Sequence, residues 1–461
     1  MCGIAGFWNL DNAPVNIKML DLFTDSLAHR GPDGRGVFID DTVALGLGHR
    51  RLSIIDTTTI AHQPMEYSDG RYQITFNGEI YNFIELKKEL IVAGYSFSTE
   101  SDTEIILAAY DKWGEECQLK FNGMWAFALW DKKVKKLFLS RDRFGVKPLY
   151  YCFDGIHFAF ASEMKAFLAL KWFDPSFDEV VVASVINGAT LDGTDICLLK
   201  NLKRLPGGFS ISLQENTGPV LKRWWNTLDH LVEIPKTYEE QVARYRELFL
   251  EACLLRMRSD VPIGTSLSGG LDSSSSICGM KRVRDTWKNS ERGASDWQKA
   301  FVALYPGTLQ DEEKYAEIVI KYTRVHPVYC EITPKTLLDH YKEIIFQFES
   351  ISEIPIGPWI LYNAQRENGV VVSVDGHGGD EALGGYHHYP EALMRQEMAL
   401  GFFHLFKFYQ YRSLLQRLFV NPKMCNAPDL TEFLFRNLVG FMTSMMNILK
   451  SALLSTPNAT D

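Results

Sequence analysis

The chain has 461 residues, of which 57 are acidic and 48 are basic, so its formal net charge is −9 at pH 7. Because phosphate backbones are bound by basic stripes, this acidic balance excludes nucleic acid as the main partner. The length indicates two domains, and a hydrophobic content of 46% is sufficient for two packed cores.

The N-terminus and the cysteines indicate the compartment. Met1-Cys2-Gly3 is followed by neither a basic stretch nor a long apolar run, so we expect no signal peptide. The apolar stretch Phe441–Lys450 is interrupted by polar residues and is short for a membrane span. The eight cysteines include no CxxC pair, which predicts neither a zinc site nor a disulfide framework. We therefore expect a cytoplasmic protein.

Residues 1–226 alternate short strand-like runs with turn signals. Strands are expected at 42–47, 72–76, 136–139 and 157–160. Helices are expected at 80–93 and at 103–113, the second capped by Ser101 or Asp102. Many strands with few, segregated helices predict packed sheets with helices outside them, which is an α+β arrangement.

A different pattern begins after residues 226–238, which we interpret as a linker. Helices then alternate with strands, and the strands are expected at 261–267, 300–305 and 369–375. This alternation predicts an α/β parallel sheet that binds ligands at the carboxyl ends of its strands. The two domains are therefore expected at 1–226 and 227–461.

Cys2 is the candidate nucleophile of the first domain. Removal of Met1 would leave Cys2 with a free α-amine, and an amine with a pKa near ~8 can act as a base for the adjacent thiol. One residue would then supply both nucleophile and base. A cysteine near a terminus more often has no such role, so the assignment depends on the residues that follow it.

Polar residues downstream of Cys2 complete a site for glutamine. Arg51 can form two hydrogen bonds to a carboxylate. Asn77-Gly78-Glu79 is expected just after a strand, where Asn77 and Gly78 can hold an oxyanion. Glu79 and Asp102 can bind an ammonium group. Each residue has an ordinary alternative role, in a surface ion pair, a hairpin turn or a helix cap, but together they describe a glutamine site.

Ser268-Gly-Gly-Leu-Asp-Ser-Ser274 lies at the turn from the strand 261–267 to the next helix. The two glycines let backbone N–H groups converge on an anion, and the helix N-terminus and the serine hydroxyls add donors. The loop lacks the Gly-Lys-Ser/Thr ending of a Walker A loop. We therefore interpret it as a loop that holds pyrophosphate as a leaving group; the alternative is a serine-rich helix start.

A second glycine-rich turn, Asp375-Gly-His-Gly-Gly-Asp-Glu381, follows the strand at 369–375. It is expected to point into the same crevice as the serine-rich loop. Asp272 and Asp380 could share a Mg²⁺ ion that carries the ATP phosphates, because this ion prefers oxygen ligands. The alternative for Asp380-Glu381 is an acidic pair at a helix N-terminus.

Met1-Cys-Gly-Ile-Ala-Gly6 and Ser268–Ser274 together resemble the glutamine-dependent asparagine synthetases. This family joins a class II amidotransferase domain, an N-terminal-nucleophile sandwich, to an ATP-pyrophosphatase domain with a parallel sheet. His29–Asp33 and Arg141–Gly145 match framework motifs of the first domain. The resemblance extends to about Tyr389.

The resemblance implies the residues of each site. The catalytic set would be Cys2, Asn77 and Gly78. Glutamine would be bound by Arg51, Leu52, Ser53, Ile54, Ile55, Asn77, Gly78, Glu79 and Asp102. ATP would be bound by Leu267, Ser268, Gly269, Gly270, Asp272, Ser273, Ala303, Asp375 and Gly376. The acceptor acid would be activated by His377, Asp380 and Glu381, although asparagine synthetases commonly carry a glutamate where this chain has His377. The metal ligands would be Asp272 and Asp380.

The resemblance also implies the reaction. ATP would adenylate a carboxylic acid, and ammonia released from glutamine would displace AMP to give an amide. Aspartate is the default acceptor. Two alternatives remain open: amidation of another acid, such as a sugar carboxylate or a peptide side chain, and a glutaminase whose second domain is not catalytic.

Residues 391–461 do not continue the resemblance. Asparagine synthetases carry an Arg-x-Pro-Phe-Leu-Asp-like segment and a Gly-x-x-Lys-x-x-Leu-Arg-like helix, and Lys407, Lys423 and Lys450 lie in no matching context. Loss of an ammonium near the phosphates would cost on the order of 10²–10³-fold in rate, so we expect weak amide synthesis by this chain alone. Uncovered apolar faces of the second domain would also favour a homodimer.

Overall fold

The computed structural model of the protein describes residues 1–386 except 192, 216, 287–291, 309–310 and 352–353, and also residues 389, 392, 393 and 396. The chain divides into two compact units, Met1–Gly376 and His377–Asp461. The first unit therefore contains the whole of the predicted first domain and most of the predicted second. The three C-terminal lysines considered in place of the family's phosphate-facing lysine lie outside the described residues; they are Lys407, Lys423 and Lys450.

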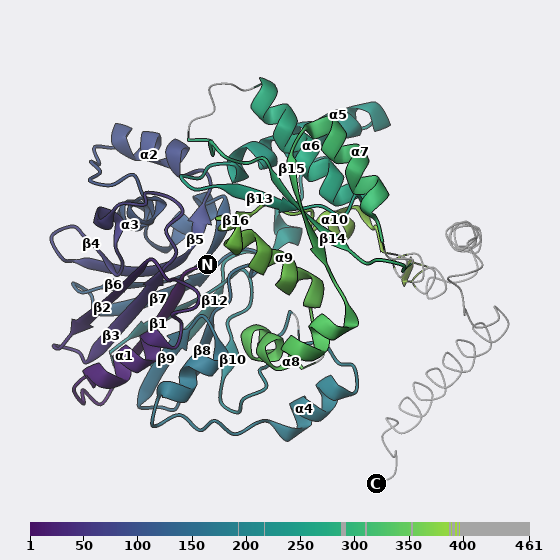
Figure 1. Ribbon diagram of the computed structural model, residues 1–461. Helices are drawn as coiled ribbons and strands as arrows, with labels where there is room; N and C mark the ends of the chain where they lie inside the picture. The colour runs from purple at the N-terminus through teal and green to yellow at the C-terminus, as the bar shows by residue number, and fades with distance from the viewer. Residues whose placement is uncertain are drawn as a thin grey trace, which may run out of the picture. The chain divides into compact units, whose positions relative to one another are not determined.

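Two six-stranded antiparallel sheets form the N-terminal half of the first unit (Figure 1). One has the strand order β10-β8-β9-β1-β3-β2 and the other β12-β11-β7-β6-β5-β4. Their strands are β1 (Gly3–Asn9), β2 (Gly34–Asp40), β3 (Leu45–Arg51), β4 (Met65–Tyr67), β5 (Tyr72–Ile80), β6 (Gly123–Asp131), β7 (Lys136–Arg141), β8 (Tyr150–Phe153), β9 (His157–Ala161), β10 (Lys203–Arg204), β11 (Phe209–Gln214) and β12 (Val220–Arg223).

Alternating side chains of β1 explain why the two sheets pack together. Ile4 and Trp8 lie in a buried cluster with residues of the other sheet, and the ring of Trp8 meets that of Trp130 edge-on at 5.2 Å. Ala5 and Phe7 have the opposite parity and pack in a separate cluster with residues of α1 (Ile17–Asp25). Because strand side chains alternate between faces, β1 serves two cores at once.

Helices cover the outer face of each sheet. α1 and η3 (Met164–Ala169) pack on the first sheet, and α2 (Phe83–Val92) and α3 (Asp102–Trp113) on the second. The other helices of this half are η1 (Thr59–Ala61), η2 (Gly114–Lys120), α4 (Glu179–Ile186) and η4 (Thr227–His230). The predicted sandwich of sheets with helices outside is confirmed.

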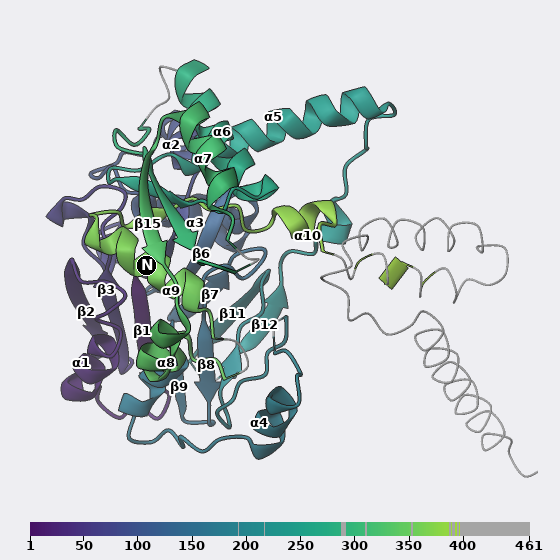
Figure 2. The ribbon, with the colours of Figure 1, turned by 45° about the vertical axis from the view of Figure 1, so that its right-hand side comes forward.

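A four-stranded parallel sheet, in the order β15-β14-β13-β16, forms the rest of the first unit. Its strands are β13 (Ile263–Ser266), β14 (Lys299–Leu304), β15 (His326–Glu331) and β16 (Val372–Ser373). Its helices are α5 (Tyr238–Arg256), α6 (Leu271–Thr286), α7 (Glu313–Thr323), α8 (Pro334–Phe348) and α9 (Ile356–Glu367). Figure 2 shows α5 reaching away from this sheet.

Both faces of the parallel sheet are covered, as the sequence predicts for an α/β sheet. Ala300 and Val302 of β14 pack with residues of α5, α6 and α7. Phe301, between them, packs on the opposite face with Leu361 of α9. In the second unit the structure describes one short helix, α10 (Gly379–Leu383).

Several predicted element bounds are wrong, and the first two have a local reason. The strand expected at 42–47 begins at Leu45, because Asp40 accepts a hydrogen bond from the Thr42 N–H at 3.1 Å and holds a turn. The helix expected at 80–93 begins at Phe83, because Ile80 still pairs with Gly123 in the sheet. The strands expected at 261–267 and 369–375 are both shorter, at four and two residues.

Candidate functional site

Cys2 immediately precedes β1 and lies against the end of β3. Its Sγ accepts a hydrogen bond from the Leu52 N–H at 3.3 Å and lies 3.5 Å from the Leu52 carbonyl oxygen. Its own carbonyl accepts a bond from Arg30 Nε at 2.9 Å. Burial raises the pKa of the Cys2 thiol, although the Leu52 N–H and the terminal ammonium act in the opposite direction. The thiol therefore needs a base to become a nucleophile.

The N-terminal amine of Met1 donates a hydrogen bond to the Arg30 carbonyl at 3.4 Å. Burial lowers the pKa of the Met1 amine to about 5, and Arg30 and Lys147 lower it further while Cys2 and Glu79 raise it. The Met1 amine is therefore neutral at pH 7, whereas the predicted base is a different group, the α-amine that removal of Met1 would free on Cys2.

Asn77 and Gly78 lie inside β5 rather than after it, so the expectation that they follow a strand is wrong. They pair with Ala126 and Trp125 of β6, because the strand continues as far as Ile80. The Asn77 side chain is 1% exposed, and neither its amide nitrogen nor its oxygen has a hydrogen-bond partner among the described residues. A Cβ at position 78 would lie 2.3 Å from the Met124 carbonyl oxygen, which explains the glycine.

Glu79 and Asp102 form a pair of buried carboxylates with exposures of 9% and 5%. Burial, together with the charge of Asp102, raises the pKa of Glu79 well above its usual range. Burial raises the pKa of Asp102 to about 6, although the Ile80 N–H donates to it at 2.9 Å. Ser101 caps α3 through the Thr103 N–H at 3.2 Å, so capping does not account for Asp102. A cation bound here would relieve the repulsion between the two acids.

Arg51 is 9% exposed and makes hydrogen bonds within its own loop. It donates to the carbonyls of Thr58, at 2.8 Å, and of Asp56. The Ser53 N–H donates to Asp33 at 2.8 Å, and the carbonyl of Ile54 accepts from the Asp260 N–H at 3.0 Å. These hydrogen bonds fix the backbone of residues 52–55 beside Cys2. Arg51 retains further N–H groups that can bind a carboxylate.

Lys147 is a site residue that the sequence pattern did not single out. It is 5% exposed, and its Nζ lies 3.0 Å from Sδ of Met1, the residue before the candidate nucleophile Cys2. The framework motif Arg141–Gly145 ends two residues before it, and that proximity is the one signal that could have identified it.

The serine-rich loop closes on itself through its hydroxyl groups. Ser268 Oγ and Ser273 Oγ lie 3.0 Å apart, and the Gly270 N–H donates to Ser268 Oγ at 3.2 Å. Gly269 has φ +83°, and a Cβ there would lie 2.4 Å from the Ala316 nitrogen. Asp272 occupies the first turn of α6. The loop therefore presents hydroxyl groups and the start of a sixteen-residue helix to an anion.

The two glycine-rich turns meet. A Cβ at Gly376 would lie 2.6 Å from the Ser273 nitrogen and 2.7 Å from the Asp272 carbonyl carbon, so only glycine fits between them. The Asp375 carboxylate accepts bonds from the Ser266 N–H at 2.7 Å, from Ser373 Oγ at 2.7 Å and from the Tyr362 hydroxyl at 3.1 Å. Asp375 therefore positions its turn, leaving little of the carboxylate for a ligand.

The remaining predicted residues differ in their surroundings. Leu267 is 1% exposed and bonds through its N–H to the Phe301 carbonyl at 2.8 Å, whereas Ala303 is half-buried in β14. His377, Asp380 and Glu381 belong to the second unit. There Glu381 accepts a bond from the Tyr386 hydroxyl at 2.8 Å. Among the described residues, no three acidic, histidine or cysteine side chains are grouped to hold a metal.

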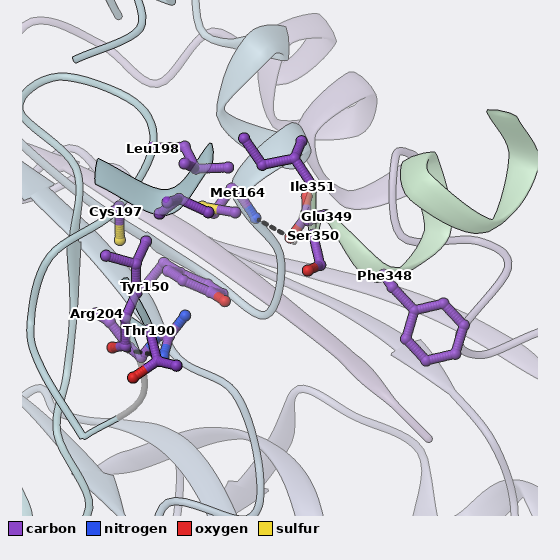
Figure 3. A pocket seen from close by; sticks show the side chains of 12 residues that line it. Tyr150, Met164, Thr190, Cys197, Leu198, Arg204, Phe348, Glu349, Ser350 and Ile351 are labelled. Atoms are coloured by element: carbon purple, nitrogen blue, oxygen red, sulfur yellow. Dashed lines mark hydrogen bonds between the residues drawn. The ribbon is translucent and has the colours of Figure 1, made fainter. Parts of the chain in front are cut away.

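Figure 3 shows a cavity of about 250 Å³ at another place in the first unit. Residues of the N-terminal half such as Tyr150, Met164 and Arg204 line it, together with Glu349 and Ile351 after α8. No residue that the sequence predicts for a site lines this cavity. Within the described part of the chain, no helix is long and apolar enough to cross a membrane.

Two protein families match this chain, one in each of its halves. The glutamine amidotransferase domain family matches residues 1–225, and the asparagine synthase family matches residues 244–439. The second match runs some fifty residues beyond Tyr389, where the motifs recognised in the sequence end.

Curated relatives share the same two-part plan. A Methanocaldococcus jannaschii protein named as a glutamine-hydrolyzing asparagine synthetase is 33% identical over 84% of this chain and 76% of its own length. Asparagine synthetase [glutamine-hydrolyzing] 1 of Bacillus subtilis is 32% identical over 85% of this chain, which spans 60% of that relative. Amidase chry2 of Gibberella zeae is 29% identical over 84% of this chain and 59% of its own length. The chain belongs to the family of glutamine-hydrolysing asparagine synthetases.

Proposed function

We propose that this chain hydrolyses glutamine at Cys2 and uses the ammonia to amidate a carboxylic acid that ATP has activated in the second domain. The observation that carries the first half is the buried amide of Asn77, which has no hydrogen-bond partner in the described part of the chain, in the domain that holds the Cys2 thiol. A buried amide with no partner is costly, and an oxyanion formed during the reaction would supply one.

In the glutaminase reaction, the α-amine of Cys2, freed by removal of Met1, takes the thiol proton. The sulfur then attacks the side-chain amide carbon of glutamine. Asn77 holds the resulting oxyanion, and ammonia leaves with a proton returned by the amine. Water then hydrolyses the thioester to glutamate. Arg51 binds the substrate carboxylate, and Glu79 with Asp102 binds its ammonium group.

In the second domain, the carboxylate of the acceptor attacks the α-phosphorus of ATP, and pyrophosphate leaves into the loop 268–274. Ammonia then attacks the acyl-adenylate and releases AMP. The meeting of Gly376 with Ser273 supports a single nucleotide site made from both turns. Asp272, in the first turn of α6, is the residue of the first unit proposed to hold Mg²⁺, which would neutralise charge on the phosphates when bound.

Aspartate is the proposed acceptor because relatives are named as asparagine synthetases. The relatives named as amidases, at 29% identity, favour a second candidate, the amidation of a different acid. The two are separated by incubating the chain with glutamine, ATP and a panel of acids, and identifying the amide by mass. Amide from aspartate supports the first candidate, and amide only from another acid the second.

The Cys2→Ala variant tests the nucleophile. We expect it to lose glutamate release from glutamine, because it removes the thiol next to the N-terminal amine, while any synthesis from added ammonium persists. The measurement is glutamate formed over time. Comparable rates in the variant and the parent would refute the assignment, and glutamine hydrolysis without any AMP formation would instead identify a glutaminase whose second domain is not catalytic.

A further inference from the structure

Arg51, the proposed ligand of the glutamine carboxylate, is oriented by the loop of residues 52–58 that follows β3. Its Nη1 donates to the Thr58 carbonyl oxygen at 2.8 Å, and its Nη2 donates to the Asp56 carbonyl oxygen. Because the guanidinium group is planar and rigid, these two carbonyls set the direction of its remaining N–H groups. The position of Asp56 therefore decides how Arg51 faces a substrate.

Asp56 has a backbone conformation that depends on its surroundings. Its φ is +52°, in the left-handed region that residues other than glycine seldom adopt. Its carboxylate is fixed from two sides: one oxygen accepts the N–H of Thr58 at 3.2 Å and its hydroxyl at 2.6 Å, and the other accepts the Glu100 N–H at 2.9 Å. These bonds hold the side chain of Asp56, but its own N–H needs an acceptor from elsewhere.

Asp260 supplies that acceptor from outside residues 1–225, the part that the amidotransferase family matches. Its carboxylate accepts a hydrogen bond from the Asp56 N–H at 2.7 Å, and its own N–H donates to the Ile54 carbonyl at 3.0 Å. Asp260 lies just before β13, in the part that the asparagine synthase family matches. Two hydrogen bonds therefore attach the loop 52–58 to the start of the strand that leads into the serine-rich loop.

Arg292 fixes the orientation of the Asp260 carboxylate. Its Nε and Nη2 donate to the two Asp260 oxygens at 2.8 Å and 2.6 Å, which is a bidentate, charge-assisted contact. Its Nη1 donates to the Glu100 carbonyl at 2.6 Å, and the Glu100 N–H is the one that bonds to Asp56. The carboxylate is therefore held with one oxygen on the Asp56 N–H.

We propose that Asp260 is a positioning residue for glutamine binding, because by accepting the Asp56 N–H it holds the carbonyl that orients Arg51. The proposal rests on the glutaminase function proposed for Cys2. Without the Asp260 carboxylate, the Asp56 N–H loses its acceptor and the left-handed turn relaxes. Arg51 then no longer presents its N–H groups to the substrate carboxylate, whereas the reacting thiol is unchanged.

The test measures glutamine binding without turnover, in a chain that carries Cys2→Ala. Isothermal titration calorimetry gives the Kd for glutamine in this chain and after the addition of Asp260→Ala, Asp260→Asn or Asp285→Ala. We expect Asp260→Ala to raise the Kd about tenfold, because it leaves a backbone N–H without its acceptor. Asp260→Asn retains an oxygen for the Asp56 N–H, so its Kd should stay within about threefold of the parent value. Asp285→Ala, at an exposed ion pair of α6, is the matched control and should leave the Kd unchanged.

Kinetics of glutamate release in the chain that retains Cys2 separate positioning from a general structural role. Asp260→Ala should raise KM for glutamine about tenfold and change kcat by less than about twofold, because it weakens binding alone. A double-mutant cycle then tests the route through Arg51. Added to Arg51→Ala, Asp260→Ala should lower kcat/KM by less than about twofold, because two residues that act as one unit do not lose their effects additively.

An unchanged Kd in Asp260→Ala would overturn the proposal. So would a loss confined to kcat, or a loss that is undiminished when Arg51 is already alanine. If thermal melting shows that Asp260→Ala does not fold, Asp260→Leu, which also lacks an acceptor, takes its place with the same criteria. A parent that releases no glutamate, together with a Cys2→Ala chain that binds no glutamine, would instead defeat the proposed function, and the role of Asp260 with it.

Discussion

At the scale of single residues, the proposed glutamine site combines groups that are individually unfavourable. Asn77 has an amide with no partner among the described residues, and Glu79 and Asp102 are acids with raised pKa values in the same domain. Residues arranged in this way destabilise the empty site and become favourable when a ligand supplies an oxyanion and an ammonium group. The site is therefore expected to be more stable with glutamine bound.

We predict that Asn77→Ala lowers kcat for glutamate release by about 10²–10³-fold, because an oxyanion donor acts mainly in the transition state. KM should change little. Asn187→Ala, at the exposed end of α4, is the control for the same truncation. The measurement is kcat and KM for glutamate release by both variants. An increase in KM without a change in kcat would place Asn77 in substrate binding instead.

At the scale of elements, the proposed nucleotide site depends on how closely two turns approach. Gly269 enters the loop with φ +83° beside the Ala316 nitrogen, and Gly376 lies against Ser273. Asp375 ties the second turn to β13 through the Ser266 N–H. A short strand pair, β13 with β16, thus determines where both loops lie.

We predict that Gly269→Ala strongly reduces AMP formation while glutamate release continues, because a Cβ would lie 2.4 Å from backbone. Gly369→Ala is the matched control: that glycine also has positive φ, at +73°, but its Cβ would meet nothing within 4 Å. In the control, alanine adds only backbone strain, which should lower the free energy of unfolding by about 1 kcal/mol. Equal AMP formation by Gly269→Ala and the control would show that the loop tolerates the shift.

At the scale of the whole molecule, a chain of hydrogen bonds and ion pairs within the first unit connects Cys2 with Glu349, the residue after α8. Arg30 bonds to the Cys2 carbonyl and, at 2.8 Å, to Glu163. Lys165 Nζ lies 2.7 Å from Glu163, and the Lys165 N–H donates to Glu349 at 2.6 Å. Burial raises the pKa of Glu163, but His29, Arg30 and Lys165 outweigh it and bring the pKa to about 2.

We predict that Glu163→Gln lowers the free energy of unfolding by roughly 2–4 kcal/mol at pH 7, as a shift of this size implies. Because the folded pKa of Glu163 is depressed from 4.5 to about 2, its contribution is present above 4.5 and is lost as pH falls through about 2. Urea unfolding at several pH values measures this. Glu116→Gln, at an exposed ion pair, should change stability little at any pH. A difference between Glu163→Gln and the parent that stays constant down to the lowest pH would contradict the prediction.

The sequence by itself determined the class of each half, the family and the order of the motifs. Short strand-like runs separated by turn signals predicted the sandwich, and strand–helix alternation predicted the parallel sheet, because both patterns are local. The glutamine and nucleotide assignments came from motif resemblance, and the roles of Asn77, Asp102 and Asp272 stay predictions.

Only the tertiary structure decided which groups face one another. Asn77 and Gly78 lie inside β5 because β6 pairs with them. The Asp375 carboxylate accepts a hydrogen bond from the Ser266 N–H because β13 lies beside β16. Lys147 lies near the Arg141–Gly145 motif, but the sequence does not show that its Nζ contacts Met1 Sδ, because Met1 lies far from it along the chain. Electrostatic neighbours are set by packing across the two sheets, and no local pattern records them.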